Sequence, residues 1–175
     1  MPKTKKVADS RTVMTEMVMP NDTNSLGNLM GGNLLRMMDV VGAICAQKHS
    51  NRIVVTASVD NVSFKKSIPL GYVVTLEAQV TRSFNSSMEV MVNVFSENIP
   101  AGTKENTNSA FLTFVAVDQS GRPIEVPELV LNDKEEEELY EGALRRRQLR
   151  LVLAGRMKPD EATELQAIFK QKFEP

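Results

Sequence analysis

The order of apolar and polar residues predicts one helix near the start of the chain, with a strand before it. Residues 13–19 alternate loosely between apolar and polar and end at Pro20, which predicts the strand. A turn-rich segment over residues 21–28 leads into residues 33–47, which predict a helix of about four turns. Its apolar residues cover most of its circumference, and this is typical of a buried helix. They are Leu34, Leu35, Met37, Met38, Val40, Val41, Ile44 and Cys45.

After this helix the pattern changes to a period of two residues. Residues 53–64 are rich in strand-forming residues, and residues 72–84 alternate between an apolar and a polar face. Two further strands are predicted over residues 87–96 and 109–118, and short polar turns between strands favour an antiparallel sheet. We therefore predict an α+β domain in which a curved antiparallel sheet of five to six strands wraps round a central helix.

The end of the chain has a different character. Residues 132–153 carry Glu early and Arg late, which suits the dipole of a helix. A second amphipathic stretch, residues 160–169, follows Pro159. The chain is accordingly divided into an N-terminal tail (1–10), a domain (11–130) and a charged helical C-terminal extension (131–175).

Composition narrows the class of protein. Apolar residues make up 42% of the 175 residues and charged residues 25%, as in globular proteins, and the net charge of −1 gives no general attraction to nucleic acid. One Cys excludes an internal disulfide and suits a reducing cytoplasm. No apolar run approaches the ~18 residues that span a bilayer, and no apolar region follows the basic N-terminus as in a signal peptide. We expect a cytoplasmic protein.

Asp39 is the first candidate for chemistry, because it stands among apolar residues in the middle of the predicted helix. Burying a carboxylate is costly unless it is paired or functional, and burial generally raises the pKa of a carboxyl group toward the range of a general base. The alternative is a surface Asp paired with Arg36, one turn earlier.

Asn24 and the pair Gly31-Gly32 lie just before the same helix. Asn24 is either ordinary turn chemistry or a functional amide. The glycines either permit close packing or leave free N–H groups at the helix N-terminus, where an oxyanion would be stabilised. They do not form a phosphate-binding loop, because no Gly-Lys-Ser/Thr follows.

Other chemistries are disfavoured. Cys45 lies among apolar residues and reads as a small core residue rather than a nucleophile. His49 is the only His and falls just past the predicted helix, where a cation would suit the C-terminal dipole. One His and one Cys make a zinc site of those ligands implausible. No Gly-x-Ser-x-Gly motif is present either.

Several ordered motifs resemble the hotdog acyl-CoA hydrolases of the cytosolic, brain acyl-CoA hydrolase type, from about residue 11 to residue 130. The motifs are Met-Pro-Asn-Asp-Thr-Asn (19–24), Gly-Asn-Leu-Met-Gly-Gly (27–32), Met-Met-Asp-Val-Val-Gly (37–42), Val-Thr-Ala-Ser-Val-Asp (55–60), Ser-Ser-Met-Glu-Val (86–90), and residues 109–118 followed by Gly-Arg-Pro (121–123).

The resemblance implies a thioesterase that converts acyl-CoA to a free acid and CoA. Asn24 and Asp39 match the family's functional Asn and acidic residue, which belong to opposite subunits of a dimer, commonly within a trimer of dimers. Asp39 would activate a water, Asn24 would orient it or the thioester, and the N–H groups at Gly31 and Gly32 would hold the oxyanion. No metal or redox cofactor is needed. The implied CoA contacts are Ala57, Ser58, Val59, Ser86, Ser87, Met88 and Arg147.

Two rivals stay open at this point. A hotdog hydratase or dehydratase would need a catalytic His, and His49 lies beyond the wrong end of the helix. A non-catalytic acyl-CoA-binding or regulatory hotdog protein would keep the CoA contacts and would not need Asp39. An assay for thiol release separates them.

Overall fold

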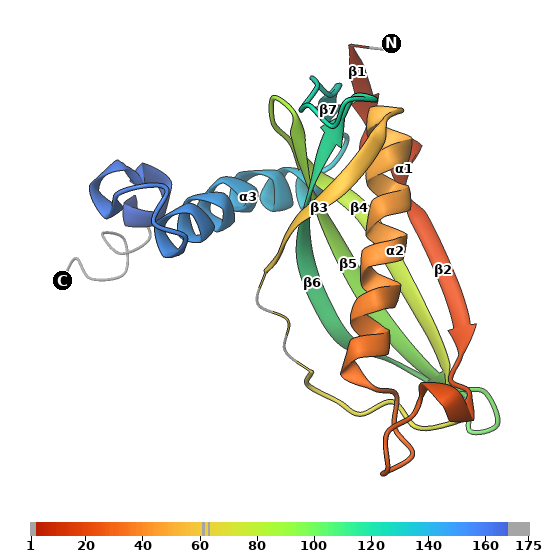
Figure 1. The fold of residues 1–175 in the computed structure, drawn as a ribbon. Coiled ribbons are helices and arrows are strands. Elements are labelled where there is room, and N and C mark those ends of the chain that lie inside the picture. The colour runs from red at the N-terminus through yellow and green to blue at the C-terminus, as the bar shows by residue number, and fades with distance from the viewer. Residues whose placement is uncertain (1–2, 61, 63, 168–175) are drawn as a thin grey trace. The chain divides into compact units, whose positions relative to one another are not determined.

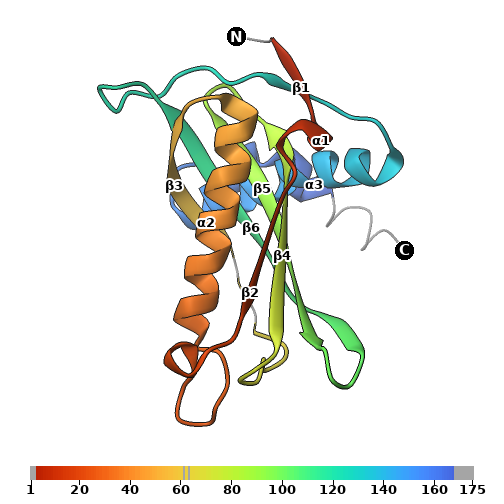
Figure 2. The same cartoon turned by 90° about the vertical axis from the view of Figure 1, so that its right-hand side faces the viewer.

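A five-stranded antiparallel sheet and one long helix make up most of the N-terminal part of the chain (Figures 1 and 2). The computed structural model describes residues 3–60, 62 and 64–167, which fall into two compact units, Met1–Val130 and Leu131–Pro175. In the first unit the strand order is β2-β4-β5-β6-β3, and helix α2 packs against the sheet. The bounds are β2 Thr12–Met17, α2 Gly31–Ser50, β3 Ile53–Asp60, β4 Val73–Ser83, β5 Ser87–Asn98 and β6 Thr103–Val117. The predicted α+β hotdog architecture is confirmed.

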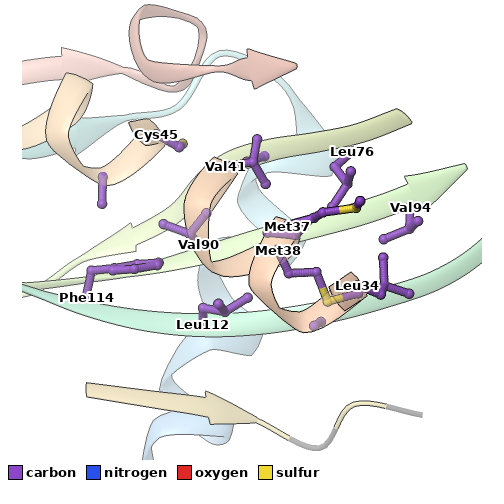
Figure 3. Close-up of a cluster of buried hydrophobic side chains, with 14 of the residues drawn as sticks. Leu34, Met37, Met38, Val41, Cys45, Leu76, Val90, Val94, Leu112 and Phe114 are labelled. Carbon is purple, nitrogen blue, oxygen red and sulfur yellow. The ribbon is translucent and has the colours of Figure 1, made fainter. Parts of the chain in front are cut away.

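The core forms between α2 and the facing side of the sheet. Figure 3 shows residues of one side of α2, among them Met37 and Met38, against side chains of β4, β5 and β6. The apolar positions predicted for β4 are at most 1% exposed: Val74, Leu76, Ala78 and Val80. Gly42 brings helix and sheet close together, because a Cβ built on it would lie 2.9 Å from the ring of Phe114.

One stripe of α2 stays open, which corrects the prediction of a helix buried all round. Arg36, Val40 and Ile44 follow each other at a spacing of four residues and are all exposed, Val40 at 38% and Ile44 at 41%. The reason is geometric: a single sheet covers one side of a helix, so the other apolar positions face outward. Exposed apolar residues also lie on the edge strand β3, where Ile53 and Val55 are 63% and 49% exposed.

The first ten residues, assigned to a tail from the sequence, contain regular structure. Strand β1 (Thr4–Lys6) pairs in parallel with β7 (Glu128–Val130), and the short helix α1 (Val7–Ser10) packs on α2. The ammonium group of Lys5 donates hydrogen bonds to the Lys48 carbonyl and, at 3.0 Å, to the Asn51 side chain. This segment therefore caps the C-terminal end of α2, where free carbonyls favour a cation.

The second unit is helical over most of its described residues. Helix α3 (Lys134–Leu153) begins at Asp133, whose side chain accepts a hydrogen bond from the Glu136 N–H at 2.9 Å. A 3₁₀ turn, η2 (Pro159–Glu161), is followed by helix over residues 163–167. The last part of the predicted stretch 160–169 lies outside the described residues. Within the described part of the chain, no helix is long and apolar enough to cross a membrane.

Candidate active site

Asp39 is held by a strand residue that the sequence analysis did not single out. The hydroxyl group of Thr56 on β3 donates a hydrogen bond of 2.6 Å to Oδ1 of Asp39 on α2. The carboxylate of Asp39 has no other hydrogen-bond partner among the described residues, so its second oxygen is available to accept a proton. Asp39 is half-buried and Thr56 is exposed, so the pair is accessible from outside the unit.

An irregularity in β3 sits next to this pair. The pairing of β3 with β6 runs from Thr56 opposite Phe114 to Ser58 opposite Thr113, so Ala57 is an extra residue in the strand. A bulge of this kind changes the direction of the side chains that follow it and is common beside functional sites. The hydroxyl group of Ser58 then donates to the Asp60 carboxylate at 2.5 Å.

Asn24 organises the turn before α2. Its side-chain oxygen accepts hydrogen bonds from the N–H groups of Leu26 (2.9 Å) and Asn28 (3.2 Å). The side-chain oxygen of Asn24 therefore has the turn-forming role that was one of the two interpretations of this residue. Its amide nitrogen has no hydrogen-bond partner among the described residues, and the residue is exposed, so one functional group stays available.

A pocket of about 350 Å³ lies at the N-terminus of α2, and Asn24 and Gly31 both line it. The ring of Phe64 packs against Gly31, and a Cβ built on Gly31 would lie 3.2 Å from that ring. A Cβ built on Gly32 would meet nothing within 4 Å. Close packing thus explains Gly31 but not Gly32. Asp39 does not line this pocket.

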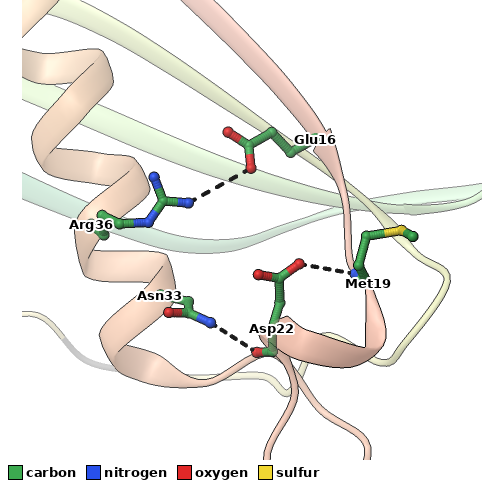
Figure 4. A network of polar contacts seen from close by, with 5 residues as sticks. All are labelled: Glu16, Met19, Asp22, Asn33 and Arg36. Atoms are coloured by element: carbon green, nitrogen blue, oxygen red, sulfur yellow. Dashed lines mark hydrogen bonds and ion pairs between the residues drawn. The ribbon is translucent and has the colours of Figure 1, made fainter.

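Arg36 does not pair with Asp39, which removes the structural alternative for that carboxylate. Its guanidinium lies 3.9 Å from the Glu16 carboxylate on β2 (Figure 4). Nearby, the Asn33 amide donates to the Asp22 carbonyl at 3.2 Å, and the Asp22 carboxylate accepts from the Met19 N–H at 3.1 Å. These contacts fix the 3₁₀ turn η1 (Pro20–Asp22) against the start of α2.

Cys45 and His49 are both buried. Burial raises the pKa of Cys45 to about 12, so the thiol is a neutral core group, as expected. His49 lies inside α2, and burial lowers its pKa, so it is neutral at pH 7 and does not act as the expected cation. Its Nε2 donates to the Pro127 carbonyl at 2.9 Å, and its Nδ1 has no partner among the described residues.

The residues that the resemblance assigns to CoA lie on strand β3, at or just before the start of strand β5, and on helix α3. In the sheet register, Thr56 on β3 and Met88 on β5 both pair with Phe114 on β6, so the two strand segments are about 10 Å apart. The Met88 side chain is fully buried, and any contact that it makes with a ligand must come from its backbone. Arg147 belongs to α3 in the second unit, and its role stays a prediction.

Comparison with known proteins identifies the family. Residues 26–102 match the model of the Thioesterase superfamily. An uncharacterized acyl-CoA thioester hydrolase of Bacillus subtilis, YkhA, is 41% identical over 145 residues, which are 83% of this chain and 84% of that protein. The chain belongs to the thioesterase superfamily.

Solved structures agree with this assignment. An apo-hexameric acyl-CoA thioesterase is 44% identical, with a TM-score of 0.84 over 87% of this chain and 97% of that one. The acyl-CoA hydrolase of Staphylococcus aureus, in complex with butyryl-CoA, CoA and CoA disulfide, is 34% identical, with a TM-score of 0.80 over 94% and 99% of the two chains. The resemblance read from the sequence motifs is thereby confirmed at the level of the family.

Proposed function

We propose that the chain is an acyl-CoA thioesterase that hydrolyses acyl-CoA to a carboxylic acid and CoA, with each active site shared by two copies of the chain. The observation that carries the proposal is the carboxylate of Asp39, held by Thr56 and left with one free oxygen beside the open stripe of α2. The names of the relatives support the substrate class, since they include acyl-CoA thioester hydrolases and acyl-CoA hydrolases.

In the proposed reaction, Asp39 takes a proton from a water molecule as the water oxygen attacks the thioester carbonyl carbon. The negative charge that develops on the carbonyl oxygen is stabilised by the N–H groups at Gly31 and Gly32, where the helix dipole adds to the effect. The amide of Asn24 orients the water or the thioester. The C–S bond then breaks, and the CoA sulfur leaves as a thiolate that takes up a proton. The proposed reaction needs no metal or redox cofactor.

Spacing in a solved neighbour supports the assignment of three residues. Three structures are of Staphylococcus aureus acyl-CoA hydrolase variants, in each of which a single Asn, Asp or Thr is replaced by Ala. Those three residues are 15 and 17 positions apart in that enzyme, and Asn24, Asp39 and Thr56 have the same two spacings here. Thr56 therefore joins Asn24 and Asp39 among the proposed site residues, as the residue that positions the Asp39 carboxylate.

The positions of the proposed groups on one chain support a site shared by two chains. Gly31 and Asp39 are on the same helix, about 12 Å apart along its axis at 1.5 Å per residue. Asn24 lines the pocket at Gly31, and Asp39 does not. One chain therefore offers two separated halves of a site, and a second copy in a two-fold arrangement would complete each half.

The exposed apolar residues of β3 and α2 are the proposed contact with that second copy. Ile53, Val55 and Val59 on the edge strand are 45–63% exposed, and Val40 and Ile44 are exposed on α2. Ile53 and Val55 alternate with Val54 and Thr56, which face α2, so these two lie on the opposite face of the sheet at its edge. An edge strand with apolar side chains is prone to pair with another strand, and a dimer would cover it. Hexameric relatives support an assembly of such dimers, which we propose to be a trimer of dimers.

CoA is proposed to lie along Ala57, Ser58 and Val59, with further contacts from the segment Ser86, Ser87 and Met88 and from Arg147. We propose a cytoplasmic location, in keeping with a rat relative named as a cytosolic acyl coenzyme A thioester hydrolase, 32% identical over 161 residues that form 42% of that protein.

Purified protein should release free thiol from acyl-CoA, measured with a thiol reagent, and Asp39→Asn should lose at least about 100-fold in kcat, because general-base assistance is typically worth 10²–10⁴-fold. Arg36→Gln is the matched control on the open stripe. Binding of acyl-CoA without thiol release would instead favour a non-catalytic acyl-CoA-binding protein.

A further inference from the structure

The pocket at the N-terminus of α2 has an apolar interior that the chemistry above does not use. Leu34 and Ile68 are each 2% exposed and Leu29 is 9% exposed, whereas Leu26 and Phe64 are 82% and 51% exposed. The pocket thus has a buried apolar floor and two large apolar side chains nearer to solvent. Exposed apolar side chains around a pocket are a usual mark of a ligand site.

The walls of this pocket are held by hydrogen bonds of the backbone. The Leu29 N–H donates to the Ile68 carbonyl at 2.8 Å, and the Leu70 N–H donates to the Gly27 carbonyl at 2.8 Å. These bonds join the Asn24 turn to the segment that carries Ile68. The pocket is therefore built into the fold of one chain.

Phe64 is held over the helix start by its neighbours in sequence. The Lys65 N–H donates to the Asn108 side chain at 3.0 Å, and Lys66 forms an ion pair with Glu105 on β6. The Phe64 ring consequently lies against Gly31. It bounds the pocket at the end of α2 where the thioester carbonyl is proposed to bind.

We infer that this pocket receives the acyl chain of the substrate and that the Phe64 ring, by the space it fills beside Gly31, limits the length of chain that the pocket can hold. The inference rests on the proposed function, which puts the thioester carbonyl at Gly31. The acyl chain continues from that carbonyl, and the nearest apolar space is the pocket floor. The pocket volume of about 350 Å³ is limited, so the preferred substrates are short- to medium-chain acyl-CoAs.

The test compares Phe64→Ala, which enlarges the pocket, with Phe64→Trp, which narrows it. Leu70→Ala is the matched control, because Leu70 is an apolar residue of the same segment, 47% exposed, that does not line the pocket. Each variant is assayed for kcat/KM with butyryl-, octanoyl- and dodecanoyl-CoA. Binding of S-alkyl-CoA thioethers of the same lengths, which cannot be hydrolysed, is measured by calorimetry.

Phe64→Ala should raise the ratio of kcat/KM for dodecanoyl-CoA over butyryl-CoA by roughly tenfold or more, since each further buried methylene is worth about fourfold. Phe64→Trp should lower the ratio, and Leu70→Ala should leave it unchanged. The thioether affinities should follow the same order. The inference is overturned if both Phe64 variants keep the wild-type dependence on chain length. Absence of thiol release from every acyl-CoA would refute the proposed hydrolysis instead, and the thioether affinities would still decide the role of Phe64.

Discussion

Removal of the Thr56 hydroxyl group tests how Asp39 is positioned. Thr56→Val keeps the branched shape of the strand residue and deletes only the hydrogen bond of 2.6 Å to the carboxylate. A hydrogen bond to a charged group contributes about 1.5–3 kcal/mol, and exposure of Thr56 to solvent favours the lower end. Because about 1.4 kcal/mol corresponds to tenfold in rate, kcat should fall by roughly 10- to 30-fold.

The assay is steady-state thiol release from a short acyl-CoA, with kcat and KM determined separately. KM should change little, because Thr56 holds the carboxylate rather than the substrate, and Thr56→Ser should recover most of kcat because it restores the hydroxyl group. Thr15→Val is the matched control, since Thr15 is also an exposed strand residue whose hydroxyl bonds another side chain, that of Thr75 at 3.2 Å. An unchanged kcat in Thr56→Val, or a Ser variant no better than the Val variant, would refute the reasoning.

Three further predictions concern stability and reactivity. Gly42→Ala should lower the free energy of unfolding, measured by urea denaturation, by about 1–2 kcal/mol, because its Cβ would meet the buried Phe114 ring at 2.9 Å. Gly32→Ala is the control and should not lower it, because a Cβ there meets nothing within 4 Å. Equal stabilities of the two variants would contradict this prediction. Cys45, whose pKa burial raises to about 12, should resist alkylation by iodoacetamide at pH 8 until the protein is unfolded, and rapid labelling of the native protein would be the contrary result. Burial lowers the pKa of His49, so just below pH 6.5 the unfolded chain binds more protons than the folded protein. The free energy of unfolding should therefore decrease as the pH is lowered through this range. His49→Gln should show a smaller fall between pH 7.5 and 5.5, and a fall of wild-type size would exclude His49 as its source.

The long elements could be predicted from the sequence because each carries many repeats of its own period. The alternation over residues 72–84 is long enough to identify β4 and its buried face, which begins at Val74. Strands β1 and β7 have three residues each, which is too short for any pattern, and their pairing joins residues far apart in the chain. Such contacts are decided by tertiary packing and leave no local signal.

The site shows the same division between local and tertiary information. Asp39 can be recognised from the sequence because a carboxylate among apolar helix residues is locally anomalous. Its partner Thr56 lies within the motif at residues 55–60 but is an ordinary residue for a strand, so its contact with Asp39 is evident only once the fold brings β3 beside α2. Helical spacing would allow Arg36 to form an ion pair with Asp39, but the fold brings Glu16 of β2 close to Arg36, and these two residues form the ion pair instead. His49 was predicted to follow the helix, where a cation would suit the dipole, but α2 continues to Ser50 and buries His49 as a neutral group.

The most direct test of a site shared by two chains is complementation between two inactive variants. Asn24→Ala and Asp39→Asn are unfolded and refolded together, mixed dimers are verified by mass spectrometry, and thiol release is compared with each variant refolded alone. If Asn24 and Asp39 of one site come from different chains, each mixed dimer has one site with both substitutions and one intact site. Such a dimer should therefore recover about half of the wild-type activity. Mixed dimers as inactive as the separate variants would contradict the shared site.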